Sequence, residues 1–351
     1  MSEVTSQKIP VTVLTGYLGA GKTTLLNRIL SENHGKKYAV IVNEFGEIGI
    51  DNDLIIGADE EVFEMNNGCI CCTVRGDLVR IMEGLMKRRG KFDAIIVETT
   101  GLADPAPVAQ TFFVDEDVQK NARLDAVVTV ADAKWLSDRL KDAPEAKNQI
   151  AFADVIVLNK TDLVTKPELA EVEARIRGIN PYARLIRTER CKVALADVLD
   201  RGAFDLDRIL EIEPNFLEVD DDHDHDHHHH HHHDHDHHDH HDHGHGLKHY
   251  HDEDMQSLAL KTDKPLDPAR FMPWLQNLVA TEGQKILRSK GILSFHDDDD
   301  RYVFQGVHMM LEGDHQRKWK DGEPRESRLV FIGRELPEQA IREGFEGCIV
   351  S

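Results

Sequence analysis

The stretch GYLGAGKTT, residues 16–24, sets the expectation for the fold, because it fits the phosphate-loop pattern G-x-x-x-x-G-K-[ST]. The fixed positions of that pattern are Gly16, Gly21, Lys22 and Thr23. A strand-like run, VTVLT, precedes it and a helix-like run, TTLLNRIL, follows it. In such a loop backbone amides surround phosphate oxygens, Lys22 reaches the β- and γ-phosphates, and the Thr23 hydroxyl binds Mg2+. A chance glycine turn would not explain the strand, the loop and the helix together.

Short apolar runs rich in Val and Ile alternate with amphipathic segments from Val11 to about Ile212. We predict strands at 11–16, 38–44, 92–101, 124–132, 153–162 and 183–189, and helices at 22–32, 77–89 and 167–179. Continuous apolar strands are typical of parallel sheets that are covered on both faces. The alternation therefore predicts an α/β fold, the doubly wound and mostly parallel sheet of a P-loop NTPase.

A His/Asp tract over residues 220–245 has no apolar periodicity, so it cannot pack a core and is expected to be a disordered insertion. We therefore predict a P-loop domain over residues 1–215, a His/Asp-rich metal-binding linker over 216–251 and a smaller α+β domain over 252–351. In the last domain, strands are predicted at 257–262, 285–295, 301–311 and 327–333, and helices at 267–283 and 337–347.

The run VIVLNKTD points to guanine as the base, because Asn159 and Asp162 follow an apolar strand in an N-K-x-D arrangement. A carboxylate there can accept two hydrogen bonds from guanine N1 and N2, which adenine does not offer. The alternative is a polar turn after a strand. The motif predicts that GTP, and not ATP, is bound.

The run FDAIIVETTG ends a predicted strand in an acid, Glu98, which can hold Mg2+ through water. Gly101, three residues later, can approach the γ-phosphate. This motif is less specific than the other two, and Glu98 as a plain polar strand end remains the alternative.

Three of the five cysteines, Cys69, Cys71 and Cys72, stand in the run NNGCICCT between the phosphate loop and the Glu98 strand. Three thiolates joined by a carboxylate such as Glu47 could form a tetrahedral site for a borderline or soft divalent ion. Redox chemistry at the C-x-x-C of residues 69–72 is an alternative, but we do not expect this motif to open a helix in a thioredoxin-like unit. Small core residues are a further alternative, and metal binding is favoured.

The two other cysteines, Cys191 and Cys348, are isolated and are interpreted as structural residues. His296 and His308, the latter within a strand pattern, are interpreted as ordinary polar residues.

The tract His223 to His245 contains sixteen of the chain's 22 histidines, interleaved with aspartates. Neutral imidazoles on a flexible segment offer weak, exchangeable sites for Zn2+, Co2+ or Ni2+, and the aspartates attract cations. Such a tract does not select one metal, so it is interpreted as a capture arm. Its internal position and irregular composition distinguish it from an expression tag.

The formal net charge of −22 argues against a nucleic-acid partner, because a phosphate backbone would be repelled. The N-terminal residues lack the basic and apolar regions of a signal peptide, and no run has the roughly 18 apolar residues of a membrane span. We expect a cytoplasmic protein without a membrane partner. The sequence leaves a homo-oligomer open.

The motifs GYLGAGKTT, NEFGEIGID, GCICC, VETTGLADP and NKTD occur in this order, and with them the chain resembles the CobW-like P-loop GTPases. That metallochaperone family includes zinc- and cobalt-handling members, and RSKGIL, FQGVH and LVFIG resemble its second domain. The resemblance implies Mg2+-dependent hydrolysis of GTP to GDP and phosphate, coupled to delivery of Zn2+ or Co2+ to a client metalloprotein. Val42 stands where some relatives carry a carboxylate before NEFGE.

The resemblance also assigns residues to roles. Phosphate contacts fall to Gly16, Gly19, Ala20, Gly21, Lys22, Thr23 and Thr24, guanine contacts to Asn159, Lys160 and Asp162, and the delivered metal to Cys69, Cys71 and Cys72. Lys22, Thr23 and Glu98 would support catalysis.

We hypothesise that GTP-bound switch loops bring Glu47 and the three thiolates together, and that hydrolysis releases the metal to the client. One rival is a His-rich metal buffer or storage protein in which GTP only regulates stability. A second is a nickel-insertion GTPase, although the GCICC spacing speaks against it. A small-molecule kinase would lack the guanine motif.

Overall fold

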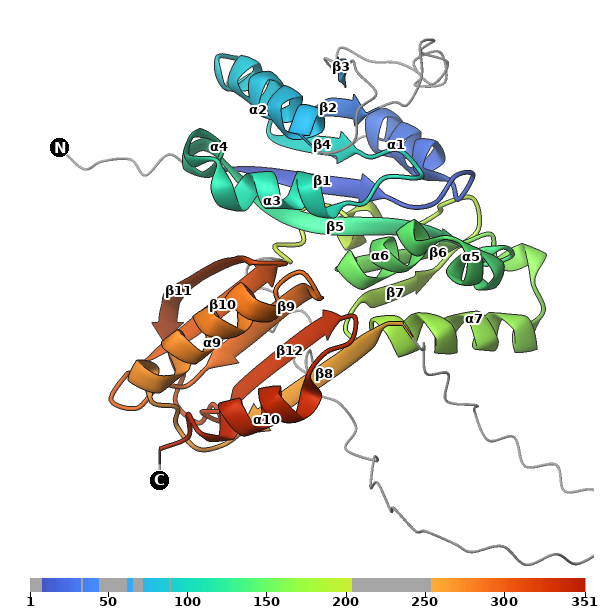
Figure 1. Ribbon diagram of the computed structural model, residues 1–351. Coiled ribbons are helices and arrows are strands. Elements are labelled where there is room, and N and C mark those ends of the chain that lie inside the picture. The colour runs from blue at the N-terminus through green and yellow to red at the C-terminus, as the bar shows by residue number, and fades with distance from the viewer. Residues whose placement is uncertain are drawn as a thin grey trace, which may run out of the picture.

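A computed structural model describes residues 8–32, 34–43, 62–65, 72–88, 90–203 and 254–350, which form two packed domains (Figure 1). The Cys69–Cys71 segment, Glu47, the His/Asp tract and the two predicted domain boundaries lie outside these residues, so the boundaries stay predictions. No helix in the described part of the chain is long and apolar enough to cross a membrane.

The N-terminal domain is built on a sheet with the strand order β3-β2-β4-β1-β5-β6-β7, in which every neighbouring pair is parallel. Its strands are β1 (Ile9–Thr15), β2 (Tyr38–Asn43), β3 (Val62–Met65), β4 (Ala94–Glu98), β5 (Ala122–Asp132), β6 (Val155–Asn159) and β7 (Arg184–Arg187). The predicted P-loop fold is confirmed. Strand β3 was not predicted, because four residues carry too little periodicity.

Helices cover both faces of this sheet, since the side chains of its strands alternate between two buried clusters. One face packs on α2 (Cys72–Met86), α3 (Ala106–Val114), α4 (Glu116–Asn121), α5 (Leu136–Asp142), α6 (Pro144–Phe152) and α7 (Lys166–Ile179). The other packs on α1 (Lys22–Ser31) and on residues 191–203, which include the 3-10 turn η3 (Leu195–Asp197). A second 3-10 turn, η2 (Thr161–Leu163), follows β6.

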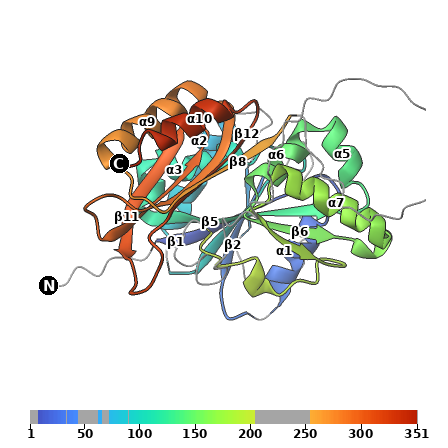
Figure 2. The same cartoon turned by 90° about the horizontal axis from the view of Figure 1, so that it is seen from below.

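The C-terminal domain is an antiparallel sheet with the order β11-β10-β9-β12-β8. Its strands are β8 (Gln256–Thr262), β9 (Ile286–Leu293), β10 (Asp300–Val307), β11 (Met310–Lys318) and β12 (Ser327–Gly333). Helices α9 (Pro268–Glu282) and α10 (Glu338–Glu346) pack on one face (Figure 2). The opposite face contributes Leu287, Val307, Val330 and Ile332 to the core of the N-terminal domain. The predicted α+β class is confirmed.

One strand prediction in this domain was wrong. Residues 301–311 were predicted as a single strand, but β10 ends at Val307 and β11 begins at Met310. His308, which we had placed within a strand pattern, lies in the turn with φ of 53°, in the left-handed region. Most side chains of β11 are exposed, so no apolar pattern marked the second strand of this hairpin.

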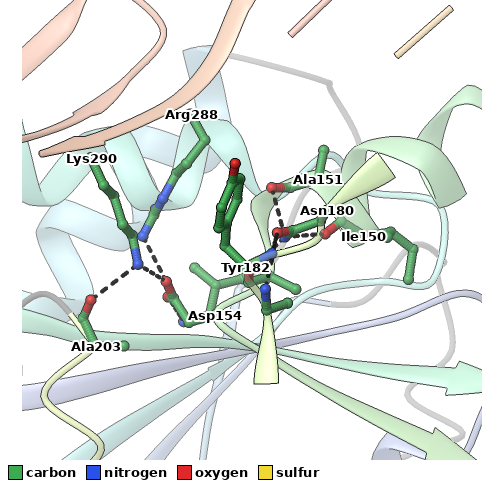
Figure 3. A network of polar contacts seen from close by, with 11 residues as sticks. Ile150, Ala151, Asp154, Asn180, Tyr182, Ala203, Arg288 and Lys290 are labelled. Carbon is green, nitrogen blue, oxygen red and sulfur yellow. Dashed lines mark hydrogen bonds and ion pairs between the residues drawn. The ribbon is translucent and has the colours of Figure 1, made fainter. Parts of the chain in front are cut away.

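The two domains meet at a buried carboxylate, Asp154, immediately before β6 (Figure 3). Its Oδ1 accepts hydrogen bonds from Arg288 Nη2 at 2.9 Å and Lys290 Nζ at 2.5 Å, and its Oδ2 accepts one from Val127 N at 2.8 Å. Exposed fractions are 3% for the Asp154 side chain, 4% for Arg288 and 10% for Lys290. Lys290 also donates to the Ala203 carbonyl, so β9 is bonded to a second segment of the first domain.

Replacing Asp154 with Ala should lower the free energy of unfolding by about 3–5 kcal/mol, because two buried cations would lose their counter-charge. Urea unfolding checks this. The matched control is Glu116→Ala, since Glu116 pairs with Lys120 only at the surface, where the side chains are 87% and 66% exposed, and such pairs contribute about 0–1 kcal/mol. Equal losses in the two variants would show that the buried ion pair is not what joins the domains.

Candidate functional site

The carboxyl ends of β1, β4, β5 and β6 lie at one edge of the parallel sheet, and the predicted site residues follow them. Glu98 ends β4 beside Leu14 of β1, and Asn159 ends β6 beside Asp132 of β5. In open α/β sheets the crevice beyond this edge is where ligands bind. The fold therefore brings together three motifs that lie at residues 16–24, 98–101 and 159–162 of the sequence.

The phosphate loop depends on glycines with left-handed backbone angles, since φ is 139° at Gly16, 74° at Gly19 and 118° at Gly21. At Gly21 a Cβ would also come within 2.6 Å of Asn159 Nδ2. Gly21 caps α1 without a side-chain hydrogen bond, which leaves the first amides of the helix for a phosphate. This arrangement fits the triphosphate of a nucleotide.

Lys22 is almost fully buried, and its Nζ donates to the Gly16 carbonyl at 2.8 Å, across the mouth of the loop. Thr23 is half-buried and Thr24 is exposed at the start of α1, while Ala20 is buried and donates its amide to Tyr17 O. The residues predicted to contact phosphate thus lie together in one loop and one helical turn.

Asn159 links the predicted base site to this loop. Its Nδ2 donates to Ala20 O at 2.9 Å, and its Oδ1 accepts from Cys191 N at 2.9 Å. The Asn159 side chain is 2% exposed, so these bonds are shielded from water. The Cys191 thiol in turn lies 3.3 Å from the Gly21 carbonyl. Asn159 of the predicted guanine motif therefore supports the phosphate loop.

Cys191 is a structural residue of the site, as predicted from its isolation. Burial raises the pKa of its thiol to about 11, so the sulfur stays protonated at neutral pH. Arg28 of α1 donates to the Cys191 and Val193 carbonyls, which fixes this backbone against the helix.

Lys160 adopts a left-handed φ of 61° and extends over the loop, where its Nζ donates to Gly19 O at 2.7 Å and to Asp132 Oδ2 at 2.7 Å. Asp162 lies exposed in the 3-10 turn η2. The Asp162 carboxylate is therefore accessible to a ligand from solvent.

Glu98 lies at the end of β4 with 7% of its surface exposed, close to the start of the phosphate loop. The next residue, Thr99, donates its hydroxyl to Thr15 Oγ1 at 2.9 Å. A Cβ on Gly101 would come within 2.6 Å of Leu18 N, so this glycine rests directly on the loop. The Thr100 hydroxyl is enclosed and has no hydrogen-bond partner among the described residues, as expected beside a phosphate or hydrated Mg2+.

The predicted metal ligands are described only in part. Cys69, Cys71, Glu47 and His223 to His245 lie outside the described residues, and Cys72 is the first residue of α2. Cys72 begins a helix, but the sheet around it is that of a P-loop domain, so the C-x-x-C does not open a helix in a thioredoxin-like unit, as expected. Within the described ranges no group of three or more His, Cys, Asp or Glu side chains could hold a metal ion.

The strand before the cysteine segment, β3, nevertheless ends at the phosphate edge of the sheet. Strand β3 runs parallel to β2, and its last residue, Met65, pairs with Asn43 at the end of β2. Strand β2 in turn pairs in parallel with β4, where Val42 lies beside Glu98. Residues 66–71 therefore connect this edge to the start of α2.

Sequence reasoning missed two polar residues of the site. Asp132 ends a predicted apolar strand, as Glu98 does, and this signal could have identified it. Gln149 of α6 donates to Gly101 O and Ala103 O, both at 3.1 Å, and nothing in its sequence context marks it.

Comparisons with known proteins agree with this geometry. A family model described as "CobW/HypB/UreG, nucleotide-binding domain" matches residues 10–187, and one described as "Cobalamin synthesis protein cobW C-terminal domain" matches residues 255–349. The zinc chaperone YjiA of Escherichia coli is 33% identical over 97% of this chain and 98% of its own length. The zinc-regulated GTPase metalloprotein activator 1 of Schizosaccharomyces pombe is 34% identical over 95% of this chain and 84% of its own.

The solved structure of Zn(II)-bound YjiA GTPase from E. coli aligns with a TM-score of 0.71 at 28% identity and covers 98% of this chain and all of that one. The family models and the solved structure therefore agree with the two domains and the phosphate loop described above. This chain belongs to the CobW family of P-loop proteins, with the nucleotide-binding domain that the family shares with HypB and UreG and the CobW C-terminal domain.

Proposed function

We propose that this protein is a metallochaperone that binds a divalent metal ion, Zn2+ in the first place, and transfers it to a client metalloprotein when it hydrolyses GTP. The hydrolase is a P-loop GTPase of the CobW family. The observation that carries the proposal is the parallel pairing of β3 with β2, because β3, the strand before the cysteine segment, therefore ends at the same sheet edge as β1, the strand before the phosphate loop.

The hydrolytic part of the proposal rests on the described side chains. Lys22 places a positive charge at the loop mouth, and the α1 amides supply donors for phosphate oxygens. Mg2+ would be held by the Thr23 hydroxyl and, through water, by Glu98, and when bound it neutralises charge on the phosphates. The enclosed Thr100 hydroxyl and the buried Glu98 carboxylate fit this role.

The metal-transfer part rests on ligand chemistry and on the relatives. Thiolates of Cys69, Cys71 and Cys72, with Glu47 as a fourth ligand, suit Zn2+ and also Co2+. The YjiA and S. pombe relatives are named for zinc, which favours zinc as the cargo here. The His223 to His245 tract would supply weak sites that collect the ion, and a client metalloprotein would receive it in the cytoplasm.

Asp162→Asn should lower the affinity for GTP by at least about tenfold and raise the affinity for xanthosine triphosphate, because an amide donates where a carboxylate accepts. Asp162 is exposed, so folding should not change. Titration of both fluorescent nucleotides measures the effect. Asp138→Asn is the control, since Asp138 lies exposed on α5. Unchanged base preference would show that this carboxylate does not contact guanine.

Zinc should bind at least about tenfold more tightly to the Mg2+-GTP-analogue form than to the GDP form, a coupling of about 1.4 kcal/mol. Competition with a chromophoric chelator, on the full chain and on a chain without residues 220–245, measures both affinities. Cys71→Ser should abolish the tight site, whereas Cys348→Ser should not, since Cys348 is buried in the C-terminal domain and donates to Gly344 O. Equal affinities in the two nucleotide states would refute coupled transfer, and zinc binding that vanishes only with the tract would indicate a buffer protein.

A further inference from the structure

Helix α6 (Pro144–Phe152) lies between the two domains and contains two buried amides, Asn148 and Gln149, with 8% and 1% of their surfaces exposed. Burying an amide costs free energy unless its hydrogen bonds are satisfied, so the hydrogen-bond partners of these side chains show which parts of the structure they hold in place. Both side chains bond to residues 99–105, the loop between Glu98 and α3.

Gln149 fixes the first half of that loop. Its Nε2 donates to the carbonyls of Gly101 and Ala103, and its own backbone carbonyl accepts a hydrogen bond from Thr129 Oγ1 of β5 at 2.7 Å. Because Gly101 lies against Leu18 of the phosphate loop, a shift of α6 would move backbone that contacts this loop.

Asn148 connects the second half of the loop to the C-terminal domain. Its Nδ2 donates to Asp104 Oδ2 at 2.8 Å, and the other oxygen of Asp104 accepts from Ala106 N at 2.9 Å, at the start of α3. The Asn148 Oδ1 accepts from Arg334 Nη2 at 2.5 Å. Arg334 directly follows β12, and its backbone amide bonds to Lys285 O at 2.9 Å.

Arg334 makes one of several polar contacts between the domains. The buried Asp154 ion pair fixes β9, and Lys147 on the same helix α6 pairs with Asp254 at 2.7 Å. Arg334 differs from these contacts because its hydrogen bond continues through Asn148 into the loop that follows Glu98.

We propose that Asn148 is a positioning residue for GTP hydrolysis. Its amide links the loop of residues 99–105 to Arg334, so that the turnover rate depends on the position of the C-terminal domain. The inference rests on the GTPase activity of the proposed function and extends it to the second domain. Asn148 suits this role because one amide satisfies both an anionic acceptor and a cationic donor.

The test is the GTP turnover of the full-length Asn148→Asp variant. In this variant the new carboxylate strengthens the bond to Arg334 but repels the carboxylate of Asp104. We expect kcat to fall by about tenfold, with KM for GTP changed less than about threefold. In the double variant N148D/D104N the donor and acceptor exchange places, and kcat should return to within about threefold of wild type. A role in domain docking alone would leave kcat of the single variant unchanged.

Two variants of Arg334 test the domain link. Arg334→Met should lower kcat as Asn148→Asp does, and Arg334→Lys should restore part of it, because Lys also donates to an amide oxygen. Lys147→Met, the matched control on the same helix and interface, should keep the wild-type kcat. Thermal unfolding and KM establish that each variant is folded.

Three results would overturn the proposal: wild-type kcat in Asn148→Asp, no recovery in the double variant, or no effect of Arg334→Met. Absence of GTP hydrolysis by the wild-type chain would instead reject the proposed function, and this inference with it.

Discussion

The bond on which the two-domain structure depends is the buried ion pair of Asp154 with Arg288 and Lys290. A carboxylate taken out of water is tolerated only when its oxygens are fully paired, and Asp154 achieves this with two cations and the Val127 amide. The C-terminal sheet therefore docks in one register, because a shift by one residue along β9 would turn both cations away from the carboxylate.

Strand β6 carries this constraint to the nucleotide site. Its five residues are all buried, with Asp154 immediately before its first residue and Asn159 at its last. Asn159 fixes the phosphate loop through Ala20. One short strand thus positions the domain contact at its amino end and the phosphate loop at its carboxyl end. Close packing along the strand leaves its backbone little freedom to move. Helix α6, which precedes β6, also connects the two regions. Its Asn148 bonds to Arg334 of the C-terminal domain, and its Gln149 bonds to Gly101 beside the phosphate loop.

The fold and the nucleotide motifs could be predicted from sequence because each is a local pattern. Apolar strands can be recognised from their composition. The glycines of residues 16–24 can be recognised because the phosphate loop needs backbone angles that glycine adopts most readily. The hairpin at His308 could not be predicted, since β11 is an exposed edge strand without alternation. Gln149 and Cys191 act through bonds to residues that are distant in sequence, and no spacing rule identifies such partners in a single sequence.

The sheet geometry also limits how a metal on the thiolates can sense the nucleotide. Strands β2 and β4 lie between β3 and β1, so the end of β3 is three strand spacings, about 14 Å, from the end of β1. A metal held at the end of β3 would lie beyond the Debye length of about 8 Å at physiological ionic strength, so its direct attraction to the phosphates would be largely screened. Under the proposed function, coupling from such a position would have to pass through the chain itself, starting where the chain leaves this edge at Asn43 and Met65.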